Sequence, residues 1–166
     1  MTRIVLLEQF KRFTEDSIRE IIMPVRRQEN DKENPKPRAA EVHLMRLIKG
    51  TSAKKAAPYI IHQVITGRDY QAEGESAKGQ TVVRSIFGVY SEDEQEGSLM
   101  LLGLIEKLRF DLLEAVVIGK QFQLNLEAGL EMLIYPDDTA PYYVGEMIST
   151  WYIPGIKRKV DLYGKY

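Results

Sequence analysis

The sequence contains no cysteine and only two histidines, which limits its capacity for nucleophilic and metal chemistry. Without cysteine the chain can form neither a disulfide framework nor a thiolate metal site, and we expect an intracellular origin rather than secretion. Lys and Arg together number 23 and Asp and Glu 24, so the formal net charge is −1. A charge this close to zero gives no general attraction to nucleic acid and permits self-association.

A long apolar run is also missing. The N-terminal segment MTRIVLLEQFKRF has an apolar run only from Ile4 to Leu7, which is too short for a signal peptide or a membrane span. We therefore expect a soluble protein with no membrane partner. The 166 residues are 44% hydrophobic and 28% charged, as in a globular domain that buries its own core. The expected organisation is a single α+β domain over 1–166, with a charged linker at about 25–40 and a flexible basic tail at about 157–166.

The first expected helix runs from Arg3 to Met23 and ends at Pro24, which cannot continue a helix. The segment VRRQENDKENPKPRAA that follows has no periodicity and forms the linker. Spacings of three and four residues place one set of side chains on a common face of the helix. These residues are Leu6, Phe10, Phe13, Ser17 and Ile21.

The second expected helix begins at Ser91, which we interpret as the N-cap of a capping box completed by Glu94. The acidic residues of SEDE would then lie at the positive end of the helix dipole. The helix is predicted to run to about Ala115, before Gly119 ends the pattern. Its apolar stripe consists of Leu101, Ile105, Leu108 and Leu112.

Five segments carry the signals of β-strands, with β-branched and aromatic residues bounded by turn residues. The segment QFQLNLEAGLEMLIY alternates throughout, which predicts one strand with a buried face and a bulge at Gly129. We therefore predict an α+β fold with a mainly antiparallel sheet of about five strands packed against two helices. The segments are EVHLMRLI, PYIIHQVIT, TVVRSIFGVY, QFQLNLEAGLEMLIY and YYVGEMISTWYI. The predicted buried face of the alternating segment comprises Phe122, Leu124, Leu126, Ala128, Leu130, Met132 and Ile134.

Two adjacent aspartates, Asp137 and Asp138, lie between prolines in YPDDTAP. Aspartate favours turns because its side chain accepts hydrogen bonds from nearby backbone N–H groups, so we predict that both shape the tip of a hairpin. A metal-dependent nuclease that places Asp after Pro would need Glu-x-Lys on the next strand, but Glu146 is followed by Met and Ile.

The segment GESAKGQT resembles a phosphate-binding loop in the spacing of its glycines. Gln80 stands where the phosphate-binding lysine is required, and the segment leads into a strand rather than a helix. We predict a flexible hairpin loop from Gly67 to Gly79.

The two histidines, His43 and His62, lie in the first two expected strands, and an antiparallel pairing would place them nearly opposite each other. Glu41 would share their face, and two imidazoles with one carboxylate can hold zinc at an open site. A register slip of one residue would separate these groups. The alternative to this metal site is that each histidine is only a hydrogen-bonded structural residue.

The last strand is apolar on both faces. Val144, Ile148 and Tyr152 lie on the face opposite Trp151, where a domain buried on one side normally has polar residues. These three residues form a candidate assembly interface. Either a partner molecule covers this face, or the N-terminal helix of the same chain covers it.

The order of these segments resembles that of the tail-terminator or tail-completion proteins of tailed bacteriophages. The resemblance spans roughly Glu41 to Lys157 and is carried by EVHLMRLIKG, PYIIHQVITGRD, VVRSIFGVYSEDEQEG, FQLNLEAGLEMLIYPDD and PYYVGEMISTWYIPGI.

This resemblance implies a structural virion protein without catalytic residues, metal or cofactors. It implies a homo-oligomeric ring, expected to be a hexamer, that caps the tail tube and takes part in head–tail joining. The implied partners are the tail tube protein, the head–tail connector proteins, and DNA that passes through the lumen without sequence-specific binding. The implied location is the tail or neck of the virion, after assembly in the host cytoplasm. The alternatives are a small metal-dependent hydrolase that uses Glu41, His43 and His62, or another phage neck or tail adaptor protein.

Overall fold

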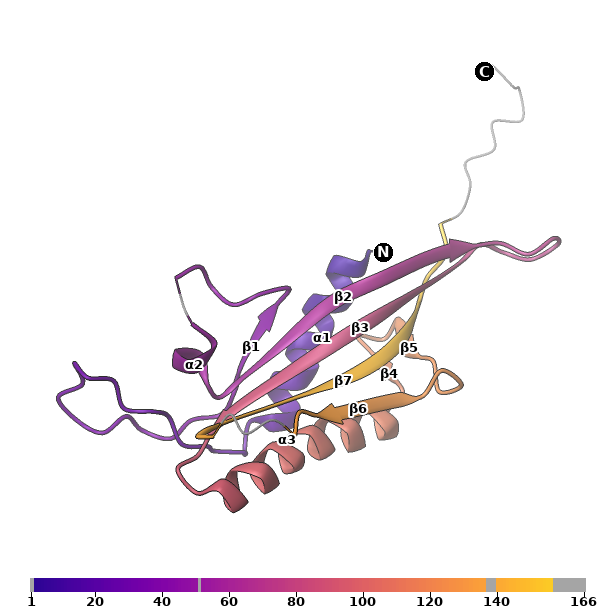
Figure 1. The fold of residues 1–166 in the computed structure, drawn as a ribbon. Coiled ribbons are helices and arrows are strands. Elements are labelled where there is room, and N and C mark those ends of the chain that lie inside the picture. The colour runs from indigo at the N-terminus through magenta and orange to yellow at the C-terminus, as the bar shows by residue number, and fades with distance from the viewer. Residues whose placement is uncertain (1, 51, 137–139, 157–166) are drawn as a thin grey trace.

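The computed structural model describes residues 2–50, 52–136 and 140–156, which form an α+β fold with a mixed, mostly antiparallel sheet (Figure 1). The basic tail expected at 157–166 and the two aspartates at 137 and 138 lie outside the described residues. The helices are α1 (Arg3–Ile18), α2 (Ala53–Ala56) and α3 (Glu94–Ala115). The strands are β1 (Glu41–Leu44), β2 (Tyr59–Tyr70), β3 (Lys78–Tyr90), β4 (Val117–Ile118), β5 (Phe122–Leu124), β6 (Leu130–Ile134) and β7 (Tyr142–Ile153).

The long strands β2, β3 and β7 form the centre of the sheet. The strand order is β1-β2-β3-β7-β5-β4, and β6 also pairs with β7. Only the β1–β2 pair is parallel, and the other pairs are antiparallel. The predicted mainly antiparallel sheet is therefore confirmed, with seven strands among the described residues instead of about five.

Both long helices pack on the same face of the sheet. In Figure 1, α1 lies behind the long strands and α3 runs below them, beside β6. The ring of Phe10 on α1 lies 5.3 Å from that of Trp151 on β7, and both residues are fully buried. The N-terminal helix therefore covers the Trp151 face and not the face of the candidate interface, so the alternative that this helix covers Val144, Ile148 and Tyr152 is wrong.

Helix α1 is shorter than predicted. It ends at Ile18. The backbones of Met23 and Arg38 then exchange two hydrogen bonds in an isolated antiparallel bridge, with N–O distances of 2.9 and 3.0 Å. This bridge requires extended backbone at Met23, so the helix cannot continue to Pro24. The buried face is accordingly shifted from the predicted set and comprises Leu6, Leu7, Phe10, Thr14 and Ile18.

Helix α3 has the predicted stripe and C-terminal end but a different N-cap. The N-cap is Asp93, whose Oδ1 accepts a hydrogen bond of 2.9 Å from the backbone N–H of Glu96. Ser91, the predicted cap, accepts instead from the backbone N–H of Asp93 at 3.2 Å. Both residue types cap well, and the capping-box pattern placed the start two residues too early. The residues of the predicted stripe, Leu101, Ile105, Leu108 and Leu112, are all buried.

The segment 121–135 is not the single strand that its alternation predicted. A turn divides it into β5 and β6, with a hydrogen bond of 3.1 Å from the N–H of Ala128 to Oδ1 of Asn125. Gly129 has a φ of +77°, which belongs to this turn rather than to a bulge in a strand. Phe122 and Leu124 are buried as predicted, whereas Leu126, Met132 and Ile134 are exposed, so only the first part of the alternating face belongs to the core.

Candidate assembly surface

The predicted zinc site does not form. Because β1 and β2 are parallel and not antiparallel, His43 pairs with Ile61 and lies on the opposite face of the sheet from His62. Glu41 does share the face of His43, and its Oε2 lies 3.5 Å from Nε2 of His43. Across the described ranges, no group of three or more His, Asp or Glu side chains is placed to hold a metal ion.

His62 has a structural environment. Oγ1 of Thr14 lies 2.8 Å from its Nε2, Oγ of Ser85 lies 2.7 Å from its Nδ1, and the ring of Phe10 stacks on it at 4.0 Å. Complete burial lowers the pKa of His62 to about 3, because the charged form would lose its hydration. The imidazole is therefore neutral and holds α1 against β2 and β3.

The pairing around the two aspartates agrees with a hairpin. Strands β6 and β7 are antiparallel, with Ile134 opposite Gly145, and they flank the segment that contains Asp137 and Asp138. The carboxylate of Glu146 accepts a hydrogen bond of 2.6 Å from the hydroxyl of Tyr135. It therefore takes part in a local contact between the two strands.

The predicted hairpin loop at 67–79 is shorter than expected. Strand β2 continues to Tyr70 and β3 begins at Lys78, so only residues 71–77 form the connection. The segment GESAKGQT leads into β3 and opens no helix, which leaves it without the helix N-terminus of a phosphate-binding loop.

The sheet has an open face, defined here as the face that α1 and α3 leave uncovered. Val144, Ile148 and Tyr152 lie on it, opposite Trp151 as the alternation predicted, and each is half-buried. Ile148 lies between Arg84 of β3 and Glu131 of β6 in the strand pairing. The open face therefore mixes apolar and charged side chains.

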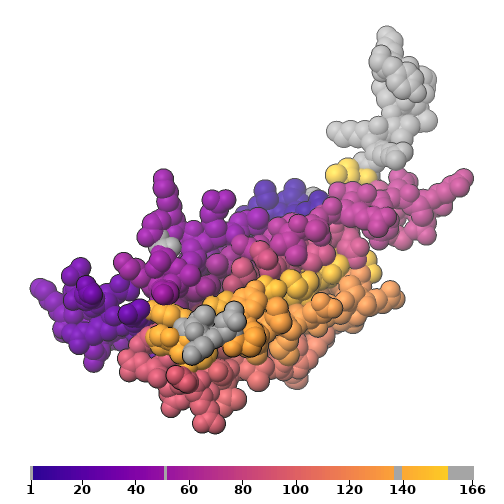
Figure 2. All heavy atoms as spheres, viewed as in Figure 1, coloured from indigo at the N-terminus to yellow at the C-terminus, as the bar shows by residue number. Residues whose placement is uncertain are grey.

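Strand β6 adds an exposed apolar edge to this surface. It pairs with β7 along one side, and Leu133, which pairs with Glu146 on the open face, is 52% exposed. Figure 2 shows this orange segment at the surface between β7 and α3. The sequence pattern assigned Met132 and Ile134 to the core and treated the other face of this segment as polar, so it did not predict the exposed apolar residues. Leu133 and the adjacent Tyr135 are exposed on the side of the open face, whereas the exposed Met132 and Ile134 pair with Met147 and Gly145 on the face of Trp151.

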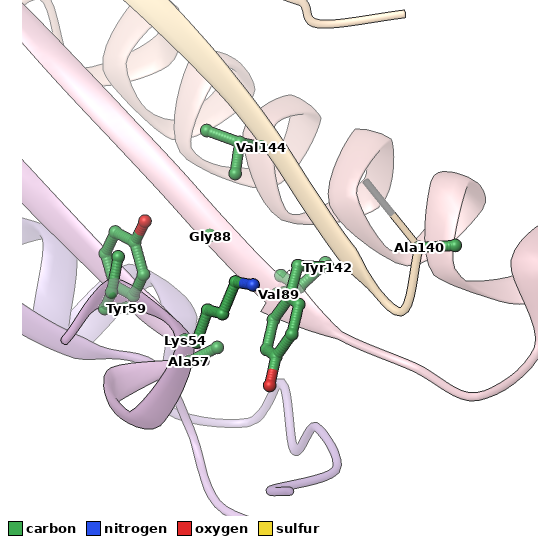
Figure 3. Close-up of a pocket in the computed structure, with 9 residues that line it drawn as sticks. Lys54, Ala57, Tyr59, Gly88, Val89, Ala140, Tyr142 and Val144 are labelled. Atoms are coloured by element: carbon green, nitrogen blue, oxygen red, sulfur yellow. The ribbon is translucent and has the colours of Figure 1, made fainter. Parts of the chain in front are cut away.

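A pocket of about 450 Å³ lies at one end of the open face, where α2 crosses the ends of the strands (Figure 3). Lys54 of α2 extends between the rings of Tyr59 and Tyr142. Gly88 forms part of the wall, and a Cβ there would lie only 2.4 Å from the Tyr59 ring, so the ring position requires glycine. Because the pocket is built from distant segments, no local motif in the sequence could have revealed it.

A second hollow of about 410 Å³ adjoins this pocket, because Lys54 and Tyr142 line both. Among the described residues, its wall carries four cationic side chains and one acidic side chain, that of Glu29. Nη1 of Arg26 lies 2.5 Å from the hydroxyl of Tyr142, and its guanidinium lies 5.7 Å from the centre of that ring. We call this hollow the basic pocket, and its cations are Arg26, Arg27, Lys54 and Lys55.

Comparison with protein-family models and with curated proteins identifies no relative of this chain. No model of a known protein family matches the chain, and no curated protein matches it. In the described part of the chain, no helix is long and apolar enough to cross a membrane. The functional conclusion must therefore come from the surfaces described above, together with the resemblance noted in the sequence.

Proposed function

We propose that the chain is a structural virion protein of a tailed bacteriophage, which assembles into a ring on the end of the tail tube and joins the tail to the head. The observation that carries this proposal is the open face of the sheet, where neither α1 nor α3 covers Val144, Ile148 and Tyr152. Apolar side chains on an uncovered sheet face favour burial against another molecule.

The molecule also has two projecting segments that suit a ring subunit. The β2–β3 hairpin projects from one end and the arm at 25–37 from the other (Figures 1 and 2). A closed ring needs a heterologous interface, in which one patch of a subunit meets a different patch of its neighbour. An elongated subunit with distinct ends offers two different surfaces for such a contact.

The test places a charge on the open face. Ile148→Glu and Val144→Glu each add a carboxylate to a contact that the proposal makes apolar, and the helix-covered core is unchanged. Ile4→Glu is the matched control, because Ile4 is an exposed apolar residue on α1 and lies away from the open face. Each variant is mixed with tail tubes assembled from the tube protein of the same virus, and tube ends are examined by electron microscopy.

We expect wild-type protein and Ile4→Glu to form rings on tube ends, and the two open-face variants to remain folded monomers. Circular dichroism checks that the variants fold. The proposal fails if wild-type protein neither forms rings nor binds tube ends, or if both open-face variants cap tubes as well as wild type does. Rings that bind a head connector but not the tube would instead indicate another neck adaptor.

The metal-dependent hydrolase gains no support from the geometry. Its proposed ligands His43 and His62 lie on opposite faces of the sheet, and His62 is fully buried. An open catalytic zinc site needs three ligands that converge on one accessible position.

A further inference from the structure

The tip of the β2–β3 hairpin, defined as residues 71–77, is an exposed acidic projection. The backbone N–H of Glu75 donates to the carbonyl of Ala72 at 3.0 Å, which closes the turn. The carboxylate of Glu75 pairs with Lys78 at 2.5 Å, whereas Glu73 has no ion-pair partner among the residues that the structure describes. Among the residues that the structure describes, the hairpin therefore presents at least one carboxylate without a neutralising cation.

The basic pocket has the opposite character. None of its cations, Arg26, Arg27, Lys54 and Lys55, forms an ion pair within 4.0 Å in the described parts of the chain. Lys54 instead lies 5.8 Å from the centre of the Tyr142 ring, and Arg27 donates to the carbonyl of Asp31 at 3.3 Å. Four cations surround one hollow, and Glu29 is the only carboxylate among the described residues of its wall, so these residues form a local excess of positive charge.

The tip cannot reach the basic pocket of its own subunit. The pocket lies beside the first residue of β2, Tyr59, and the tip follows the last, Tyr70. Twelve residues of paired strand separate the two, a span of about 36 Å at 3.3 Å per residue. Figure 2 shows the tip and the arm that lines the pocket at opposite ends of the molecule. Any contact between them must therefore join two molecules.

Two side-chain contacts lie at the base of the hairpin, and one of them joins it to α1. Nη2 of Arg3 on α1 lies 3.2 Å from Oδ2 of Asp69, and the guanidinium of Arg68 lies 5.3 Å from the centre of the Tyr70 ring. A held hairpin loses less conformational entropy on docking than a free loop does.

We propose that the acidic hairpin tip of one subunit docks in the basic pocket of a second copy of the chain. This inference rests on the proposed ring and names the contact that links its neighbours. Glu73 reaches the cations of the pocket, and the small residues around it let the turn approach the wall formed by Tyr142. Because tip and pocket are different surfaces at opposite ends, the contact is heterologous and can repeat from subunit to subunit.

The test uses disulfide cross-linking, which the chain suits because it has no cysteine of its own. Ala72→Cys marks the tip and Ala53→Cys marks the pocket, and both residues are exposed. The double variant is oxidised in the presence of tail tubes and analysed on denaturing gels. The matched control pairs Ala72→Cys with Ala128→Cys, which lies in the exposed turn between β5 and β6.

We expect the tip–pocket pair to give a ladder of covalent oligomers, and a mixture of the two single variants to give covalent dimers and nothing larger. Glu73→Lys in the tip should lower the cross-linked fraction at least about tenfold, since close charge pairs at interfaces couple by this much or more. Adding Lys54→Glu to that variant should restore cross-linking, because it recreates an opposite-charge pair.

The possible results separate this contact from the proposed function. Rings on tube ends without cross-linking, or with equal cross-linking of the control pair, would refute the docking contact and leave the ring standing. Absence of any assembly would refute both. Binding of duplex DNA by the wild-type monomer that Lys54→Glu abolishes would assign the basic pocket to nucleic acid and overturn the contact between copies.

Discussion

His62 makes the stability of the fold depend on pH in a direction that the structure determines. Its pKa falls from 6.5 to about 3 on folding, because burial removes water from the imidazole and no carboxylate takes its place. The partners that contact the ring are Thr14, Ser85 and Phe10, none of which carries charge. The folded state therefore binds fewer protons than the unfolded state between pH 6.5 and about 3.

The sign and magnitude of this pH dependence follow from the difference in proton binding between the folded and unfolded states. The contribution of neutral His62 is fully present above pH 6.5 and decreases as the pH falls toward about 3. Each pH unit in that window costs about 1.4 kcal/mol of unfolding free energy, so lowering the pH from 7 to about 4.5 removes about 3 kcal/mol. Carboxylates also titrate in this range, so the effect of His62 must be isolated by a variant.

His62→Gln supplies this comparison, because an amide can bond to both neighbouring hydroxyls but does not titrate. Urea unfolding is followed through Trp151, the only tryptophan, which is fully buried and lies near Phe10. We expect the stability difference between wild type and variant to change by about 3 kcal/mol between pH 7 and about 4.5, with wild type losing more.

Two results would refute the reasoning about His62. One is a pair of stability curves that stay parallel across this range. The other is a proton NMR titration in which the His62 ring of the folded wild-type protein becomes charged near pH 6.5. This titration needs only the wild-type protein and so tests the reasoning even if His62→Gln does not fold.

Three further outcomes are expected. Asp93→Ala removes the N-cap of α3 and should cost about 1 kcal/mol in urea unfolding, and an unchanged midpoint would contradict that role. Gly88→Ala places a Cβ within 2.4 Å of the Tyr59 ring and should lower the free energy of unfolding by about 1–3 kcal/mol. Tyr59→Leu should partly relieve this clash, so additive stability losses in the double variant would disprove it. Purified protein should contain no stoichiometric metal by elemental analysis, and a chelator should leave its melting temperature unchanged, whereas stoichiometric zinc would reopen the hydrolase hypothesis.

The stripe of α3 and the alternation of β7 could be predicted from the sequence because each is a long amphipathic pattern. Leu101 to Leu112 repeats at helical spacing, and Met147 and Trp151 share one face of a strand; all four are buried. Such patterns indicate directly which side chains are buried on folding. Prediction therefore succeeded where one element buries one continuous face.

The same patterns could not predict whether two neighbouring strands pair in parallel or antiparallel. The alternation in β1 would look the same in a parallel or an antiparallel pair, and only the parallel pairing places His43 beside Ile61. The segment 121–135 failed for a related reason, because its alternation continues through the turn at 125–129. Asn125 and Gly129 were the only local signals of that turn.

The proposed assembly surface on the open face is not a continuous apolar patch. Ile148 lies between Arg84 and Glu131, and Nη2 of Arg84 bonds to Oε1 of Gln63 at 2.9 Å across the strands. Long charged side chains cover part of the neighbouring apolar surface with their methylene groups while the charges remain in water. A lone subunit is thereby protected against nonspecific aggregation.

A partner that docks on the proposed interface must accommodate these charges as well as bury Ile148. A partner that lacks complementary groups would leave Arg84 or Glu131 desolvated and unpaired, at a cost that exceeds the gain from one apolar side chain. The alternation of charge and apolar surface would therefore select among partners, and burial of apolar area would supply the affinity. This combination suits the proposed ring subunit, because such a subunit must stay apart from its copies until the correct neighbour and the end of the tube are both present.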